Sequence, residues 1–113
     1  KLAGRGHTCL TPSTRCLATV QDKLLQRHAY AEHGAPTPRA ALIEADGASA
    51  IREIGFPMVL KARFGGYDGK GTRFADSRTN FDDLAPDWNR GGWLAEEFVD
   101  FKRELAVVVC RSQ

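Results

Sequence analysis

The sequence has no long apolar run and no excess of charge of one sign. Its longest apolar stretch, Leu105–Cys110, has the length of a buried strand, whereas a helix that spans a bilayer needs roughly 20 apolar residues. The 16 Lys and Arg residues stand against 14 Asp and Glu residues, which leaves a formal charge of +2. A charge this small does not indicate nucleic acid or an anionic membrane as the partner.

Cysteine is scarce, and its spacing excludes two kinds of site. Cys9, Cys16 and Cys110 are odd in number and form no C-x-x-C pair, so the sequence predicts neither a disulfide framework nor a zinc site. We expect reduced, structural thiols of the kind found in a cytoplasmic protein. His28 and His33 are five residues apart and lie off a common helical face, so they predict no metal site.

Length and composition favour a single globular unit. The chain has 113 residues, of which 42% are hydrophobic and 27% charged, as is usual for one domain. It begins at Lys1 rather than Met and stops just after an apolar stretch. We therefore expect a fragment of a longer protein.

Hydrophobic periodicity predicts alternating helices and strands. Leu17, Val20 and Leu24 recur at three- and four-residue steps, which predicts one helix over 13–33 that Gly34 ends. Two shorter helices are predicted at 48–54 and 79–84, with Asp46 and Thr79 as their caps. Extended segments are predicted at 39–45, 58–62, 72–75, 93–99 and 104–111. This order of elements predicts an α+β fold with a largely antiparallel sheet, in which 58–62 and 72–75 form a hairpin.

The connection within that hairpin is the most informative segment. It reads F-G-G-Y-D-G-K-G-T from Phe64 to Thr72 and places four glycines in the seven positions 65–71. Glycines let the backbone approach another molecule closely, and successive N–H groups in such a loop can bind an anion. Lys70 within the loop and Lys61 before it suit phosphate oxygens. A long hairpin turn with a solvated lysine is the alternative that the composition leaves open.

Three familiar phosphate-binding loops do not fit this segment. The Walker pattern requires Gly where Phe64 stands and Ser or Thr where Gly71 stands. The dinucleotide fingerprint must open a helix, but this loop is predicted to open a strand. The kinase loop requires Gly at the position of Phe74. A phosphate cover on a β-hairpin remains.

Two motifs and a linker resemble one enzyme family. V-L-K-x-x-x-G-G-Y-D-G-K-G covers Val59–Gly71, and A-E-E-F-V-x-F-x-R-E-L-A-V covers Ala95–Val107. Upstream, Q-D-K-L begins a helical segment that leads to H-G-A-P-T-P. From about Pro12 to the last residue the chain resembles the 5-(carboxyamino)imidazole ribonucleotide synthases of the ATP-grasp superfamily. The Y-D-G-K-G element distinguishes that family from biotin carboxylases and formate-dependent transformylases.

The resemblance implies a set of nucleotide-binding residues. Lys23 and Lys61 match lysines that contact the phosphates, and the loop residues match a flexible cover of the triphosphate. Glu96, Glu97, Phe98 and Val99 match the hinge strand that recognises adenine, and Glu104 matches the carboxylate that binds the ribose hydroxyls. The implied ATP site is therefore Lys23, Lys61, Gly66, Tyr67, Asp68, Gly69, Lys70, Gly71, Thr72, Glu96, Glu97, Phe98, Val99 and Glu104. Because Glu96 and Glu97 are adjacent on a strand, at most one of them points into a cleft.

The resemblance also implies a domain layout and a reaction. Residues 1–34 correspond to the end of a preceding domain and a linker helix, 35–94 to the ATP-grasp lid, and 95–113 to the hinge and the first strand of the C-terminal domain. The whole enzyme uses ATP to carboxylate 5-aminoimidazole ribonucleotide with bicarbonate in purine biosynthesis. Its partners are then small molecules, not nucleic acid or membrane, and the resemblance allows a homodimer.

No complete active site is expected within the chain. Mg²⁺ prefers carboxylate oxygens, and the family's ligands lie beyond the second motif, so we expect no catalytic or metal-binding residue here and no activity of the fragment alone. Two other interpretations stay open. The chain could be the lid of a different ATP-grasp ligase, or a nucleotide-binding module without catalysis.

Overall fold

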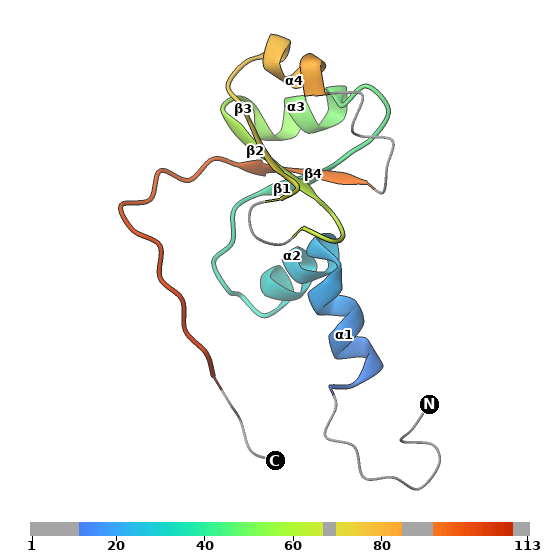
Figure 1. Cartoon of the computed structure of the whole chain (residues 1–113), viewed down its shortest axis with the longest axis vertical. Coiled ribbons are helices and arrows are strands. Elements are labelled where there is room, and N and C mark those ends of the chain that lie inside the picture. The colour runs from blue at the N-terminus through green and yellow to red at the C-terminus, as the bar shows by residue number, and fades with distance from the viewer. Residues whose placement is uncertain (1–11, 67–69, 85–91, 110–113) are drawn as a thin grey trace, which may run out of the picture.

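A computed structural model describes residues 12–66, 70–84 and 92–109, and these contain four helices and four strands (Figure 1). In chain order the elements are α1 Thr14–Gln21, α2 Lys23–Glu32, β1 Ala40–Ile43, α3 Ala48–Ile54, β2 Met58–Ala62, β3 Thr72–Ala75, α4 Arg78–Leu84 and β4 Trp93–Glu97. Within these ranges, no helix has the length and apolar character that crossing a membrane requires.

The four strands form one sheet in the order β1-β4-β2-β3, and each neighbouring pair is antiparallel. β4 comes last in the sequence but lies between β1 and β2, so that Ala95 is opposite both Ala41 and Leu60. β2 and β3 form the predicted hairpin, with Lys61 opposite Thr72. The α+β fold with an antiparallel sheet is confirmed.

One face of the sheet carries the hydrophobic core. In Figure 1, α3 and α4 lie above the sheet, and α1 and α2 lie below it. Side chains alternate along a strand, so Met58, Leu60 and Ala95 point together toward α3 and α4 and are buried. Phe81 of α4 fills the space between the helices and the sheet, and the Phe56 ring meets it edge-on at 6.2 Å.

The opposite face is more polar and receives α2. Val59 and Lys61 of β2 and Leu94 and Glu96 of β4 alternate with the core residues, and an ion pair joins Glu96 to Arg27 of α2. Lys61 and Glu96 thus lie on the face that α3 and α4 do not cover.

The single helix predicted over 13–33 is wrong, because the chain breaks at Asp22. This residue has extended backbone angles, φ −111° and ψ 109°, and it both ends α1 and begins α2. The hydrophobic period continues through the break, which is why periodicity did not reveal it. Gly34 follows α2 with a φ of 67°, as predicted for a left-handed end.

Several predicted boundaries also differ. α4 begins at Arg78, where the Ser77 hydroxyl accepts a hydrogen bond from the Asn80 N–H, so Thr79 is not its cap. Gly47 rather than Asp46 precedes α3, although the Asp46 carboxylate still accepts from the Ala48 N–H at 3.0 Å.

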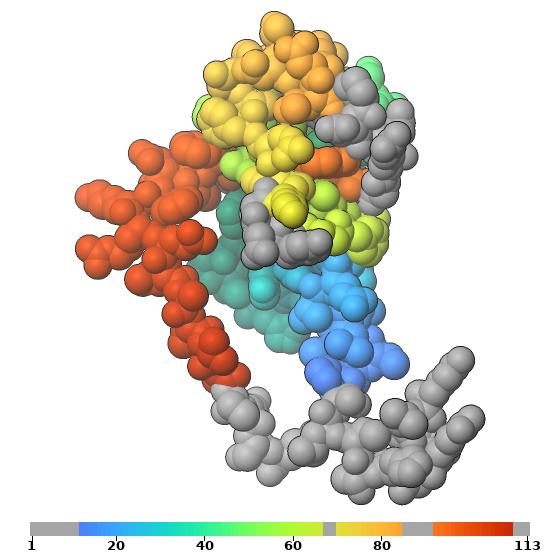
Figure 2. Space-filling model, viewed as in Figure 1, coloured from blue at the N-terminus to red at the C-terminus, as the bar shows by residue number. Residues whose placement is uncertain are grey.

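The strand predicted at 104–111 is absent from its described part, residues 104–109. A strand needs a partner for its backbone groups, and the chain beyond β4 pairs with none of the described strands. Leu105 and Val108 are 83% and 98% exposed. Figure 2 shows this segment running down beside the body rather than packing into it. β4 itself ends at Glu97 instead of Val99.

Gly47 offers a test of this core. Its φ is +70°, and a Cβ placed there would overlap the Phe81 ring. We expect Gly47→Ala to destabilise the fold by about 2–5 kcal/mol, from left-handed strain of about 1–2 kcal/mol plus overpacking of about 1–3 kcal/mol. Gly34→Ala is the control, because its φ is similar, +67°, but no atom lies within 4 Å of a Cβ there. Urea unfolding measures the stability that each variant loses, and equal losses would show that Phe81 does not confine the turn at Gly47.

Candidate functional site

The glycine loop leaves the end of β2 beside two lysines. The Ala62 N–H donates to the Gly71 carbonyl at 2.7 Å, and Gly71 has a φ of +85°, which closes the base of the loop. Lys61 immediately precedes this closure, and Thr72 begins β3 opposite it. Lys70 is exposed on the loop. The predictions for Tyr67, Asp68 and Gly69 fall outside the described residues.

A buried carboxylate lies next to Lys61. Glu96 is only 2% exposed, and its two oxygens contact two cations: Oε1 accepts from Arg27 at 2.7 Å and Oε2 lies 2.7 Å from Lys61 Nζ. A buried carboxylate is stable when it is paired in this way. Glu96 therefore joins α2, through Arg27, to the face of the sheet on which Lys61 lies.

Glu97 points the other way, as the alternation along a strand requires. It pairs with Arg39 at 3.2 Å on the exposed surface, and hydrogen bonds from Arg39 hold the pKa of the Glu97 carboxyl below its ordinary value. Arg39 in turn donates to the carbonyl of Glu53 in α3. Of the two adjacent glutamates, only Glu96 faces the side of Lys61, in agreement with the sequence prediction.

A hollow of about 200 Å³ opens beside Lys61 and Glu96. Its lining combines the end of β4 with β2 and the segment before β1: Pro38, Val59, Lys61, Glu96, Glu97, Phe98, Val99 and Phe101. The Phe98 ring meets the Phe74 ring edge-on at 5.4 Å. The lining combines apolar side chains with the charged groups of Lys61, Glu96 and Glu97, a mixture that is typical of ligand pockets. All four predicted hinge residues, Glu96–Val99, line this hollow together with Lys61.

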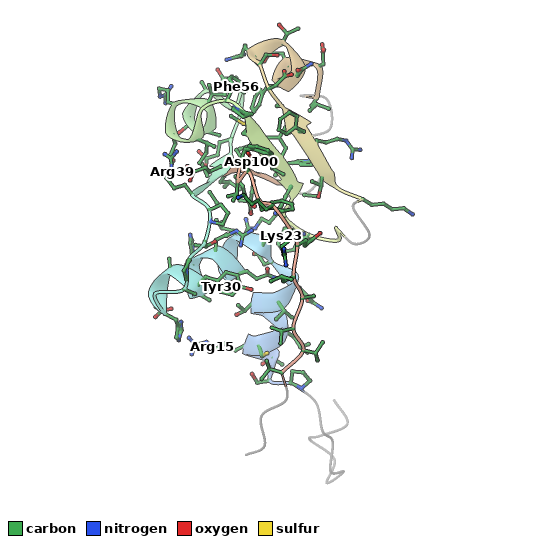
Figure 3. The ribbon with its side chains drawn as sticks, turned by 90° about the vertical axis from the view of Figure 1, so that its left-hand side faces the viewer. Arg15, Lys23, Tyr30, Arg39, Phe56 and Asp100 are labelled. Atoms are coloured by element: carbon green, nitrogen blue, oxygen red, sulfur yellow. The ribbon has the colours of Figure 1, made fainter. Side chains whose placement is uncertain are left out.

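Lys23 reaches the other side of the loop. It is the first residue of α2, and its Nζ would lie 3.1 Å from a Cβ placed on Gly66. A second hollow of about 400 Å³ is lined by Val20, Gln21, Lys23, Phe64, Gly65 and Gly66. Figure 3 places Lys23 where the helices meet the strands. The structure thus brings Lys23 beside Gly66 of the glycine loop.

Glu104 is a predicted residue that the structure does not bring to either hollow. It lies exposed in the extended segment after β4 and is not part of the lining of either hollow.

Three residues that hold the site together escaped the sequence analysis. Asp22 is 5% exposed and accepts two hydrogen bonds from Arg63, at 2.8 and 2.7 Å. These hydrogen bonds hold the pKa of the Asp22 carboxyl below its ordinary value. Arg27 is the third. It follows Lys23 by four residues on the same helical face, and that spacing is the one signal that could have indicated it.

The described residues do not form a magnesium site. No group of three or more His, Cys, Asp or Glu side chains among them could hold a metal ion, and the Glu96 carboxylate is already occupied by two cations.

Comparison with known proteins places the chain in a family. Its sequence matches the ATP-grasp domain over residues 28–113, and the chain belongs to this family. It is 42% identical over 104 residues to the N5-carboxyaminoimidazole ribonucleotide synthase of Synechococcus elongatus, which covers 90% of this chain and 26% of that relative. The chain therefore spans about a quarter of the length of the relatives it matches.

Solved structures agree in fold. The N5-carboxyaminoimidazole ribonucleotide synthetase of Thermotoga maritima is 30% identical and aligns with a TM-score of 0.64 over 89% of this chain and 25% of that one. The N5-carboxyaminoimidazole synthetase of Staphylococcus aureus, solved with ADP, is 27% identical with a TM-score of 0.68 over 73% and 22%. The family resemblance seen in the sequence is confirmed.

The role of Glu96 can be tested through stability. Glu96→Gln removes the negative charge that Arg27 and Lys61 share, and we expect a loss of about 3 kcal/mol, the lower end for breaking a buried pair, because both cations keep some contact with water. Glu97→Gln is the matched control and should change stability little, since its ion pair is exposed. Unfolding in denaturant at one pH compares the two, and similar small losses would contradict the assignment.

The Asp22 pair predicts a pH dependence. Because its folded pKa is lowered, its contribution to stability is complete above the ordinary value of 3.8 and is lost as the pH falls below that value. The difference in unfolding free energy between the native sequence and Asp22→Asn should therefore be constant near neutral pH and shrink below about pH 4. Denaturant unfolding between pH 7 and 3 measures it, and a difference that stays constant over this range would contradict the pairing.

Proposed function

We propose that the chain is the ATP-binding part of a ligase that carboxylates 5-aminoimidazole ribonucleotide with bicarbonate. The observation that carries the proposal is the position of Lys61, which lies between the closed base of the glycine loop and the hollow lined by the hinge strand. The relative from Synechococcus elongatus and the ADP-bound structure from Staphylococcus aureus support the nucleotide and the reaction class.

In this proposal, the chain's residues divide the nucleotide between them. Lys23, Lys61 and the loop from Gly66 to Thr72, including Tyr67, Asp68, Gly69, Lys70 and Gly71, bind phosphate. Main-chain groups of Glu96–Val99 bind adenine at the end of β4, where the strand's regular pairing stops at Glu97. Glu104 binds the ribose hydroxyls once the segment after β4 is in place. Residues 35–94 form the lid, between 1–34 and 95–113.

The Glu96 cluster allows Lys61 to change partners. Phosphate oxygens and the Glu96 carboxylate are both acceptors for the Lys61 ammonium group. When Lys61 binds a phosphate oxygen instead of Glu96, Arg27, which lies 2.7 Å from Glu96, still pairs with the buried carboxylate. ATP supplies the phosphoryl group that activates a carboxyl-type oxygen, and the chain's contribution is to bind the triphosphate, balance its charge and exclude water.

Two further parts of the proposal concern other components. Mg²⁺ would bind ATP in the whole ligase through ligands outside the described residues, and the whole protein would take bicarbonate and could form a homodimer. The lid of another ATP-grasp ligase is the alternative. Release of phosphate from ATP separates the two: the proposal expects it to require both 5-aminoimidazole ribonucleotide and bicarbonate, and turnover with an unrelated amine or acid would favour the alternative.

Nucleotide binding to the whole ligase tests the individual roles. Lys61→Ala removes a charge-assisted contact worth about 1.5–3 kcal/mol, so ATP should bind roughly tenfold or more weakly, whereas adenosine, which has no phosphate, should bind as before. Glu104→Ala should weaken ATP, ADP and adenosine alike. Arg78→Ala is the control, because Arg78 pairs with Asp82 on the surface of α4. Calorimetry gives the comparison, and equal weakening of adenosine and ATP by Lys61→Ala would make Lys61 structural.

A further inference from the structure

The break between α1 and α2 is joined to the end of β2 by three hydrogen bonds. Arg63 donates from Nε to Asp22 Oδ1 at 2.8 Å and from Nη2 to Asp22 Oδ2 at 2.7 Å. The main chain repeats the link, since the Lys23 N–H donates to the Arg63 carbonyl at 3.1 Å. Two parallel bonds between a guanidinium and a carboxylate fix direction as well as distance. The helical segment therefore cannot slide or turn relative to the strand that leads into the glycine loop.

The same two residues set the position of Lys23. Asp22 Oδ1 also accepts from the Leu24 N–H at 3.0 Å, so the carboxylate begins α2 and fixes the direction in which Lys23 leaves the helix. Its Nζ then lies next to Gly66, where a Cβ would be 3.1 Å both from Nζ and from the Lys70 carbonyl oxygen. A side chain at position 66 would therefore require Lys23 or the Lys70 carbonyl to shift by a few tenths of an ångström.

Arg63 anchors the loop from its other side. Its N–H donates to the Gly92 carbonyl at 3.0 Å, and its guanidinium carbon lies 5.1 Å from the centre of the Phe64 ring. Nε and Nη2 of Arg63 both donate to the Asp22 carboxylate, so the Arg63 charge is balanced within the protein. Arg63 is thus a support beside the second hollow, and Lys23 is the cation that lines it.

We infer that the Asp22–Arg63 pair is a positioning device that holds Lys23 beside Gly65 and Gly66, where Lys23 binds a phosphate group of a bound nucleotide. Neither member of the pair contacts the nucleotide itself. The inference rests on the proposed function, because it assigns the hollow lined by Lys23 and Gly65–Gly66 to a phosphate.

A double-mutant cycle in the whole ligase tests it, with ATP and adenosine as the two ligands. Lys23→Ala should weaken ATP binding about tenfold, as loss of a charge-assisted contact does, and leave adenosine binding unchanged. Asp22→Asn should also weaken ATP binding selectively, by several-fold. The combination Asp22→Asn with Lys23→Ala should be no weaker for ATP than Lys23→Ala alone, because the pair acts through Lys23.

Two further variants keep the test decisive. Asp82→Asn removes the exposed Arg78–Asp82 pair and should leave both ligands unaffected. Arg63→Lys keeps the charge but loses the two-pronged contact, and it replaces Asp22→Asn with the same expected selectivity if that variant does not fold.

The outcomes separate the inference from the function on which it rests. Asp22→Asn or Arg63→Lys variants that lower the unfolding midpoint but leave the ratio of ATP to adenosine affinity unchanged would show a merely structural pair and overturn the inference. Additive effects of Asp22→Asn and Lys23→Ala would do the same. The proposed function survives both results if Lys61→Ala still weakens ATP selectively, and it fails if the native protein binds no ATP.

Discussion

The structure depends on a buried carboxylate that two cations hold from different elements. Glu96 lies on the central part of the sheet, where β4 pairs with both β1 and β2, and Arg27 and Lys61 contact its two oxygens, so this buried carboxylate is paired on both sides. The consequence is mechanical: α2 is tied to the polar face of the sheet, while α3 and α4 are packed on the other face by apolar side chains. A strand at the centre of the fold thus carries both the core and the charged cluster.

A second ion pair extends this arrangement to the glycine loop. Asp22 and Arg63 join the helix break to the end of β2, just as Arg27 and Glu96 join α2 to β4. Both pairs combine an arginine with a carboxylate that is at most 5% exposed, and an arginine suits this role because its planar group can hold a carboxylate in two directions. The helical segment is therefore fixed at two points, to β4 through Arg27 and to the end of β2 through Asp22.

The elements that local patterns specify were predictable, and those that depend on distant partners were not. Strand Met58–Ala62 and helix Ala48–Ile54 match their predictions because Gly55 and Pro57, which separate the two segments, are local signals. The break at Asp22 was missed because it is stabilised by Arg63, 41 residues away, while the hydrophobic period runs on. The strand at 104–111 was predicted from apolar composition, but composition does not supply the pairing partner that a strand requires.

In the candidate site too, some residues were predictable from the sequence and others were not, and the lysines and arginines differ in this respect. Lys23, Lys61 and the hinge strand were identified by family motifs, whereas Arg27 and Asp22 were not, since their role is to balance and hold other groups. A buried carboxylate next to a ligand lysine would lose its only cation when that lysine turned to an anion. In the proposed site, Lys61 exchanges the carboxylate for a phosphate oxygen, and the contact of Arg27 with Glu96 keeps the buried charge paired. Arg27 thus balances the charge of the buried Glu96 carboxylate, and this leaves Lys61 able to bind an anion.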